Sequence, residues 1–408
     1  MRAFRFGLAL TAAWGGLAAA RAGGVADTAP AVPSQSFATA LSPAQWEKVE
    51  NCVDHGLAWL ATQQAADGSF RTQPQGQQGQ PAITGLCVLA FLSRGHQPGF
   101  GPYGAQMDRA IDFVISCQKP DGLFSFEAPD DTTGFNGRMG RGALPRGAQA
   151  GTYNHAIAGL MLGEVFGHAN AQRTRQIKQA MEKALQFTRA LQTHPKAAPE
   201  DQGGWRYLRV QFDGADSDLS VTGWHLMFLR SARNAEFNVP QKYIDDAMSF
   251  VHRCWVDEEG LFHYTAQGSQ SFQYTRGLMG SAIVSLALAG QHQSQQALAA
   301  GDWLLAHPFQ YYGERIGSGN DRFLYSTYYC SQAAAQLGGR YWLGIYPSIA
   351  MVLVKAQEAD GSFPEDVAAS GGRGMRGNGE AAYGQTYSTA LAVLSLTPAY
   401  QLLPVYQR

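Results

Sequence analysis

The sequence predicts an all-α protein, an (α/α)6 toroid in which about six helical hairpins build an inner and an outer ring of helices. Two kinds of helical segment alternate along the chain, one turn phrase recurs between them, and the composition supports a large buried core. The 408 residues are 45% hydrophobic and 15% charged, which argues against a disordered chain. A closed repeat architecture can use this length as a single domain.

The first 22 residues have the form of a secretory signal peptide. Arg2 and Arg5 precede an apolar stretch over residues 6–20, and Ala20-Arg21-Ala22 has the small-x-small form of a cleavage site. The apolar stretch is too short for a comfortable membrane span. We expect cleavage before Gly23, with an uncleaved N-terminal anchor as the alternative. The mature protein is then exported, and is periplasmic or extracellular.

Two segments follow the signal peptide. Residues 23–42 are rich in Ala, Pro and Ser and predict a short flexible leader, and residues 43–408 predict the toroid domain. The net charge is −1 and no dense run of Lys and Arg occurs, so no nucleic-acid partner is expected. The five cysteines are odd in number and widely spaced, which indicates buried free thiols for most of them.

Helical periodicity dominates from Pro43 onward, and the helices are of two kinds. One kind carries charges on one face, as solvent-facing helices do. The other kind is almost uncharged, and a helix that is apolar on every side must be buried on every side. The charged kind covers 44–62, 106–117, 172–193 and 241–255, and the uncharged kind covers 82–93, 277–290 and 386–396. An inner ring inside an outer ring satisfies this alternation.

A recurring turn phrase, most often running from a glutamine to an Asp-Gly pair and an aromatic residue, ends the charged helices. The glycine stops the helix by adopting the left-handed conformation, and the aromatic residue can fold back onto the helix pair. Copies cover 63–70, 118–124, 257–262 and 357–363, a diverged copy reads Gln202-Gly203-Gly204-Trp205, and the most degenerate turn is at 317–320. Periods of this length are typical of repeat architectures.

These phrases resemble the Gln/Trp repeats of squalene cyclases and prenyltransferase β-subunits, and the resemblance covers residues 43–396. The segments Gly203-Gly204-Trp205-Arg206-Tyr207 and Asp218-Leu219-Ser220-Val221-Thr222-Gly223-Trp224 are especially similar to the secreted bacterial prenyltransferase/squalene-oxidase-repeat proteins. The resemblance implies the toroid fold. It implies chemistry less firmly, because the activity of those secreted proteins is largely unassigned.

The segment Asp216-Ser217-Asp218-Leu219 gives the most specific catalytic hypothesis. Squalene cyclases carry Asp-x-Asp-Asp at the start of an inner helix, and its middle acid protonates an alkene or epoxide. The resemblance therefore implies Asp218 as proton donor, assisted by Asp216, with Trp224 lining the cavity. Leu219 replaces the last acid, and the second helical domain of those cyclases is absent. The alternative is that Asp218 or Ser220 only caps the helix.

The resemblance to prenyltransferases raises the question of a zinc site, for which the sequence lacks ligands. Ser326 stands where that family has a histidine, and the inner helix that begins at Gln273 has neither Asp nor Cys. Zinc takes three or four N, S or O ligands. We therefore expect no metal and no other cofactor.

In a toroid, all inner helices begin at one rim, where free N–H groups and partial positive charge face the cavity. The ligand-binding residues predicted at this rim are Tyr153, His155, Trp224, Tyr274, Arg276, Tyr328 and Tyr387. For His155, the alternative is a hydrogen-bonded wall residue. Gly/Arg-rich loops over 134–151 and 368–384 would add Arg138, Arg141, Arg146, Arg373 and Arg376 near Arg276, Arg315 and Arg322. Such a set of arginines suits an anionic ligand group. The alternative is that these loops are solvated and bind nothing.

Three functions stay open, and whether the protein is an enzyme is undecided. The first is a terpene-cyclase-like or prenyl-handling protein that holds a small apolar or amphipathic ligand and makes peripheral membrane contact, with Trp224, Tyr274 and Tyr328 stabilising positive charge. The second is a non-catalytic exported binding protein, indicated by Leu219 and Ser326. The third is a polysaccharide-active (α/α) barrel that uses Tyr153, His155 and the arginines. The oligomeric state is left open.

Overall fold

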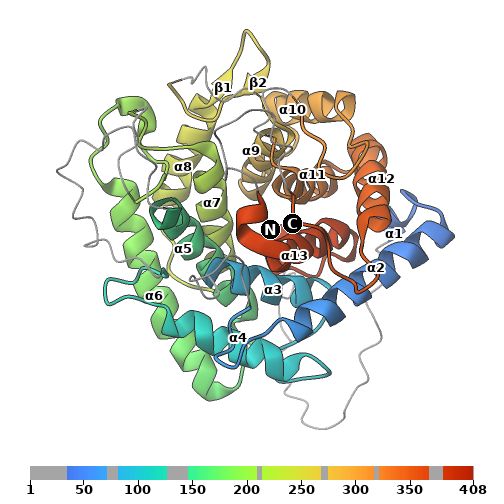
Figure 1. Cartoon of the computed structure of the whole chain (residues 1–408). Coiled ribbons are helices and arrows are strands. Elements are labelled where there is room, and N and C mark those ends of the chain that lie inside the picture. The colour runs from blue at the N-terminus through green and yellow to red at the C-terminus, as the bar shows by residue number, and fades with distance from the viewer. Residues whose placement is uncertain are drawn as a thin grey trace, which may run out of the picture.

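The computed structural model describes residues 35–70, 81–125, 146–208, 214–267, 274–316, 321–366 and 380–407. Its regular secondary structure is almost entirely helical, and the helices form an inner ring inside an outer ring (Figure 1). The predicted fold class, an all-α toroid of six hairpins, is therefore confirmed. The predicted signal peptide and the degenerate turn at 317–320 lie outside the described residues.

Outer and inner helices alternate strictly along the described chain. The outer helices are α2 (Pro43–Thr62), α4 (Gly104–Ser116), α6 (Ala171–Thr193), α8 (Gln241–Arg253), α10 (Gln295–Ala306) and α12 (Gly339–Ala356). The inner helices are α3 (Pro81–Ser93), α5 (Arg146–Val165), α7 (Leu219–Asn234), α9 (Arg276–Leu288), α11 (Phe323–Leu337) and α13 (Gly384–Leu396). Among the described residues, no helix is both long and apolar enough to span a membrane.

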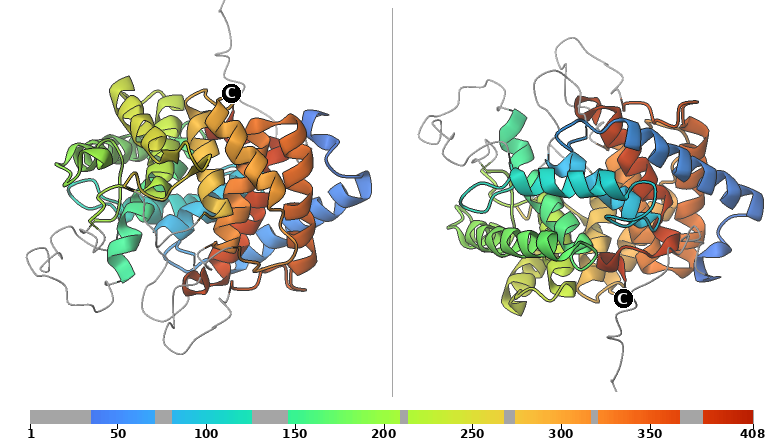
Figure 2. Two further views of the ribbon diagram at one scale, coloured as in Figure 1. Left: turned by 90° about the horizontal axis from the view of Figure 1, so that it is seen from above. Right: turned by 90° about the horizontal axis from the view of Figure 1, so that it is seen from below.

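The inner ring is closed. Each inner helix packs on the next in chain order, and α13 packs back on α3, so the last hairpin meets the first. Every residue of α3 is buried, which is the physical meaning of its uncharged sequence. The five cysteines are free and buried, as predicted. In the two views of Figure 2, which are turned by 90° from Figure 1, the orange and red helices stand side by side, roughly parallel to the axis of the ring.

A glutamine clamp joins four of the turns to the following outer helix. The Nε2 group of Gln64 donates to the carbonyl of Gly68 in its own turn, at 3.0 Å, and to the carbonyl of Gln106 in α4, at 2.8 Å. Gln118 does the same with Gly122 and Ala180, Gln192 with Gly203 and Tyr243, and Gln357 with Gly361 and Cys52. Because Cys52 belongs to α2, the last clamp closes the outer ring.

The clamp in the third turn uses Gln192, whereas the sequence pattern places Gln202 there. An insertion separates Gln192 from its glycine, and this insertion includes the short 3-10 helix η2 (Pro199–Asp201). At the fourth turn a two-stranded hairpin replaces the clamp, formed by β1 (Trp255–Val256) and β2 (Leu261–Phe262).

The glycines of the four clamped turns permit a very close approach. Gly122 has φ +99°, and a Cβ there would lie 2.3 Å from the carbonyl oxygen of Lys183 in α6. Gly68, Gly203 and Gly361 likewise combine a positive φ with a backbone carbonyl within 2.5 Å of the missing Cβ. Any side chain would therefore both strain the turn and push the next outer helix away.

The aromatic residue of each turn is tied to an inner helix. The backbone N–H of Phe70 donates to Thr84, that of Trp205 to Thr222 and that of Phe363 to Thr389. In the second turn the N–H of Phe124 donates to Nδ1 of His155 at 3.2 Å. All four aromatic side chains are fully buried. His155 thus takes the position that threonine holds in three other repeats.

Residues 35–42 differ from the predicted flexible leader. They include the short helix α1 (Gln35–Ala38), and the ring of Phe37 packs edge-on against Trp342 of α12 at 4.7 Å. The indole of Trp342 donates to the carbonyl of Phe37 at 3.0 Å, and Ser42 caps α2. Burial of Phe37 and Leu41 explains why this segment is ordered.

A C-terminal segment, residues 397–407, covers the end of the ring where the inner helices finish, which we call the base. It contains the 3-10 helices η4 (Pro398–Tyr400) and η5 (Pro404–Tyr406). Asn234 at the end of α7 donates to the carbonyl of Pro404, and the backbone N–H of Val405 donates to the carboxylate of Glu164 near the end of α5. The base is therefore closed, and the opposite end, which we call the mouth, is where the inner helices begin.

The clamp geometry predicts the effect of a single added methyl group. Gly122→Ala should lower the free energy of unfolding by about 3 kcal/mol or more, because the Cβ meets the Lys183 carbonyl as well as a left-handed backbone. Gly167→Ala is the matched control, since its φ is +92° but nothing lies within 4 Å of its Cβ. It should cost only about 1–2 kcal/mol. Equal losses in urea unfolding would contradict the close-approach argument.

Candidate functional site

Polar and aromatic side chains from four inner helices and their preceding segments meet at the mouth. This rim cluster consists of Tyr153, Arg206, Tyr207, Asp218, Ser220, Tyr264, Arg322, Tyr325, Glu380 and Tyr387. Its members are joined by hydrogen bonds, an ion pair and ring contacts, except Arg322, which interacts electrostatically with Glu380 and Tyr387. The cluster contains the predicted residues Tyr153, Asp218 and Tyr387.

Asp218 lies at the N-cap of α7 and is fully buried. Its Oδ1 accepts from the backbone N–H of Val221 at 2.8 Å, so the capping interpretation of this residue is confirmed. Its Oδ2 lies 3.4 Å from Nε of Arg206, whose guanidinium also donates to the carbonyl of Ala215. An adjacent guanidinium favours the ionised carboxylate, whereas protonation of an alkene requires the neutral acid.

Asp216 faces away from Asp218. Its Oδ2 accepts from the backbone N–H of Ala197 at 2.8 Å, outside the rim cluster. Its own N–H donates to Oδ2 of Asp201 at 2.7 Å. Burial raises the pKa of Asp201, which is the acid that the fold brings next to Asp216. The two acids of the predicted motif therefore serve different neighbours.

Three hydroxyl groups form a bridge across the ring. The hydroxyls of Tyr153 in α5 and Ser220 in α7 are 2.9 Å apart, and those of Ser220 and Tyr325 in α11 are 2.6 Å apart. Since α5 and α11 lie opposite each other in the inner ring, this hydroxyl bridge crosses the interior. Burial raises the pKa of both tyrosines well above the ordinary value, so their phenols stay protonated.

Trp224 and Tyr328 lie one helical turn deeper than the hydroxyl bridge. Their rings stack at 5.5 Å with an interplanar angle of 8°, and both side chains are almost fully buried. The hydroxyl of Tyr328 contacts that of Tyr406 from the C-terminal segment, which also approaches the sulfur of Met227. The predicted ligand-binding residues Trp224 and Tyr328 therefore belong to a packed aromatic interior below the mouth.

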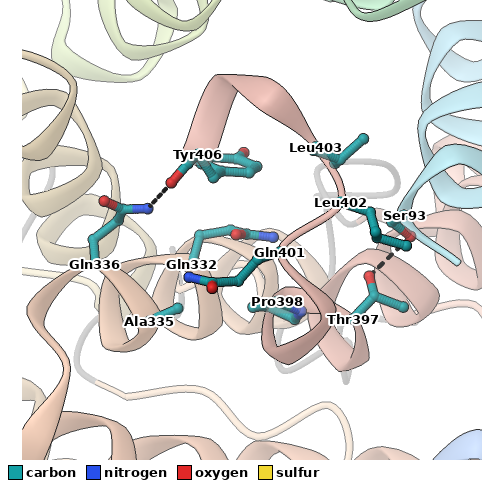
Figure 3. A pocket seen from close by; sticks show the side chains of 10 residues that line it. All are labelled: Ser93, Gln332, Ala335, Gln336, Thr397, Pro398, Gln401, Leu402, Leu403 and Tyr406. Atoms are coloured by element: carbon teal, nitrogen blue, oxygen red, sulfur yellow. Dashed lines mark hydrogen bonds between the residues drawn. The ribbon is translucent and has the colours of Figure 1, made fainter. Parts of the chain in front are cut away.

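Figure 3 shows how the C-terminal segment closes this interior at the base. Gln336 donates to the carbonyl of Tyr406 at 2.7 Å, and Thr397 donates to the hydroxyl of Ser93 at 2.9 Å. The pocket between these residues has a volume of about 20 Å³. That is room for about one water molecule, so this pocket is too small for an organic ligand.

His155 is held on both sides. Its Nδ1 accepts from the N–H of Phe124, so its Nε2 carries the proton and donates to the hydroxyl of Thr188 at 2.8 Å. Burial and the neighbouring His225 hold the pKa of His155 well below its ordinary value. The imidazole is neutral and fully buried, as expected for a hydrogen-bonded wall residue.

Arg276 and Tyr274 are placed outside the rim cluster. The guanidinium of Arg276 is fully buried, with contacts of 2.7 Å to Asp321 and 2.9 Å to Glu314, and it lies over the ring of Phe309. Ser326, at the position of the family histidine, donates to the same Asp321. Tyr274 bonds with His263 at 3.2 Å. Arg276 thus ties two inner helices together, and its charge is already neutralised.

Glu380 is a rim residue that the sequence analysis did not single out. It lies in the 3-10 helix η3 (Glu380–Tyr383), and its carboxylate accepts from the backbone N–H groups of Leu324 and Tyr325 and from the hydroxyl of Tyr387. Burial, with a contribution from Asp366, raises the pKa of Glu380 to about 7. Its position could have indicated a role, because Glu380 is the one acidic residue in the predicted rim loop 368–384.

Several predicted features fall outside the described residues. Of the rim arginines, the side chains of Arg138, Arg141, Arg146, Arg373 and Arg376 are not described. Within the described ranges, no group of three or more His, Cys, Asp and Glu side chains is arranged to hold a metal ion.

The pKa of Glu380 predicts a pH-dependent stability difference. Its pKa in the folded protein is above the ordinary 4.5, so the folded state holds this proton more tightly. The resulting stability is present below pH 4.5 and is lost as the pH rises through 7, by a total of the order of 3 kcal/mol. Thermal unfolding of the wild type and of Glu380→Gln is measured from pH 4.5 to 8. The Tm of the variant relative to that of the wild type should rise as the pH increases. A constant difference between the two would contradict the raised pKa.

Comparisons with known proteins identify the fold. No family model and no curated protein matches the chain. Among solved structures, a variant of the type II terpene cyclase MstE from Scytonema, in complex with merosterolic acid A, is 15% identical with a TM-score of 0.54 and covers 89% of this chain and 100% of its own. The α-1,6-mannanase GH76A of Salegentibacter sp. is 14% identical with a TM-score of 0.54 and covers 88% of this chain and 99% of its own. This chain therefore shares the (α/α) toroid fold with terpene cyclases and mannanases alike.

Proposed function

We propose that the chain is an exported toroid protein that binds a hydroxylated ligand, a carbohydrate in the first instance, at the mouth of its ring. The hydroxyl bridge of Tyr153, Ser220 and Tyr325 carries this proposal. It crosses the ring at the mouth, so a ligand that enters there contacts hydroxyl groups rather than a purely apolar surface. Export rests on the signal-peptide pattern of residues 1–22.

The rim cluster suits a ligand rich in hydroxyl groups. Tyrosine and serine hydroxyls both donate and accept hydrogen bonds, and tyrosine rings add flat apolar surface. Tyr207 and Tyr264 extend the cluster, with hydroxyls 3.0 Å apart and rings near the guanidinium of Arg206. A similar toroid, the GH76A mannanase of Salegentibacter sp., was solved with α-1,6-mannotriose, which supports a carbohydrate at such a mouth.

Acid–base chemistry would come from Glu380 and Tyr387. Glu380 is fully buried and reaches a ligand only through the hydroxyl of Tyr387, which donates to it at 2.9 Å. A carboxyl group whose pKa is about 7 can take up and release a proton at neutral pH. Tyr387 would exchange a proton with the ligand while Glu380 exchanges one with Tyr387.

A second candidate is acid-initiated cyclisation of an amphipathic isoprenoid, with Asp218 as donor. It is favoured by the position of Asp218 at the start of α7 and by the fold shared with MstE, which was solved with geranylgeranyl dihydroxybenzoate. The ion pair with Arg206 and the burial of Trp224 and Tyr328 weigh against it. A related secreted repeat protein that binds without catalysis is the remaining alternative.

Ligand binding at the mouth should depend on the hydroxyl bridge. Tyr325→Phe removes the hydroxyl at one end of the bridge, and we expect about a tenfold loss of affinity for a bound oligosaccharide, the loss of one to two neutral hydrogen bonds. Solvent extraction and mass spectrometry of the mature protein identify the ligand, and calorimetry with α-1,6-mannotriose and geranylgeranyl dihydroxybenzoate compares the two classes. Tyr341→Phe, on the outer helix α12, is the control. Unchanged binding by Tyr325→Phe would place the site elsewhere.

Asp218→Asn distinguishes two roles of Asp218, the capping of α7 and the negative charge that faces Arg206. Asparagine caps as well as aspartate, so the helix should persist, while the ion pair with Arg206 is lost at a cost of about 3 kcal/mol. Asp216→Asn should change stability far less, because Asp216 lies outside the ion pair. Circular dichroism and turnover of geranylgeranyl dihydroxybenzoate check both. Turnover in the wild type that survives Asp218→Asn would eliminate Asp218 as the proton donor.

A further inference from the structure

Residues 402–407 are held at the base of the ring by side chains that bind their backbone. Three inner helices, α5, α7 and α11, each supply one such side chain. Asn234 donates to the carbonyl of Pro404 at 3.0 Å, Glu164 accepts from the N–H of Val405 at 3.2 Å, and Gln336 donates to the carbonyl of Tyr406 at 2.7 Å. The ring therefore binds three successive residues through their main chain.

The backbone of this segment bonds to itself. The N–H of Tyr406 donates to the carbonyl of Leu403, and the N–H of Gln407 donates to that of Pro404. Within the described ranges, no backbone–backbone hydrogen bond joins residues 402–407 to the ring. The segment is thus a small folded unit that side chains of the ring hold in place, which is how many proteins bind a peptide.

One aromatic and two aliphatic side chains of the segment point into the ring. The hydroxyl of Tyr406 contacts that of Tyr328 in α11 and lies 3.2 Å from the sulfur of Met227 in α7. Leu403 and Val405 are buried. Main-chain hydrogen bonds supply affinity in a peptide complex, and buried side chains at fixed positions supply its specificity. The base has both.

The segment joins the ring through a strained residue. Gln401 is exposed and has φ +52°, a left-handed conformation that is unfavourable for any residue other than glycine. Next to it, a pocket of about 20 Å³ separates Leu402 and Leu403 from Gln332 and Gln336 of the ring (Figure 3). Packing is therefore incomplete beside Gln401, and detachment of the segment would release the strain there.

We propose that the base of the ring is a peptide-binding site, filled in this structure by residues 402–407 of the same chain, and that the same segment of a second copy can take their place. The site fits that occupant by identity, because the exchange keeps every contact of the segment. Gln401 is the hinge. The site lies at the opposite end of the ring from the mouth, and it does not depend on the ligand proposed there.

The first test supplies the segment to the full-length chain as a free peptide of residues 401–407, fluorescently labelled and amidated. In Tyr406→Ala the chain's own segment loses its anchor. The peptide should therefore bind this variant at least about tenfold more tightly than it binds the wild type, whose site is filled by a tethered ligand at high effective concentration. Fluorescence anisotropy measures both affinities.

Two controls isolate the site. Leu402→Ala shortens an exposed side chain of the same segment, so this variant should bind the peptide as weakly as the wild type does. A peptide that carries alanine in place of Tyr406 should bind Tyr406→Ala at least about tenfold more weakly than the natural peptide. If the two peptides bind this variant equally, or if neither binds, the proposal is overturned.

Hydrogen exchange in the wild type tests detachment without any substitution. Val405 is buried and its N–H is bonded to Glu164, so this N–H exchanges only when the segment leaves the ring or the whole chain unfolds. We expect it to exchange at least about tenfold faster than the most protected N–H groups of α11, as measured by NMR. Exchange at the same rate as α11 would make the segment a fixed part of the core and would overturn the proposal, even where Tyr406→Ala does not fold.

Discussion

The glutamine–glycine clamp, present at four of the turns, sets the distance between the hairpins that it joins, and the contacts at the mouth depend on that distance. Each clamp binds two backbone carbonyls with one side-chain amide, one in its own turn and one in the next outer helix. The glycine lets the carbonyl of that helix approach to where a Cβ would be. In an open repeat array, the repeats at a free end can shift when one interface loosens. In this ring Gln357 binds Cys52 of the first outer helix, so no free end exists and each interface constrains all the others.

Closure brings the positive ends of the inner helices together at the mouth, and most acids there serve to neutralise them. Asp218 caps α7, Asp321 accepts from the backbone of Arg276 at α9, and Glu380 accepts from two N–H groups of α11. An acid at an inner-helix start is therefore first a structural requirement of the toroid. A catalytic role needs a further observation, such as the pKa of about 7 and the contact with Tyr387 that distinguish Glu380.

The sequence predicts the rings well because their physical causes are local. The all-apolar segment 82–93 has to be buried, and the structure places it in α3 with every residue covered. The site is less predictable, because its contacts join distant residues. The partners of Arg276 are 38 and 45 residues away, and the direction of the Asp216 side chain is set by Ala197. Gln192 was missed because an insertion breaks the turn spacing, and Glu380 because no recurring pattern includes it.

A repeat protein offers its own test for which residues the architecture needs. Residues that hold the ring recur, as Thr84, Thr222 and Thr389 do when each accepts from the turn aromatic. His155 departs from that series but makes both of its hydrogen bonds inside the fold, so its departure is structural. Arg276 and Arg322 differ in how their charges are compensated: Arg276 contacts two acids directly, whereas burial opposes the charge of Arg322, and Tyr383 and Glu380 raise its pKa. On balance the pKa of Arg322 is raised, so the fold favours its charge as well. The hydroxyl bridge of Tyr153, Ser220 and Tyr325 belongs to none of these recurring contacts, so it is the feature of the mouth that the repeat architecture does not by itself account for.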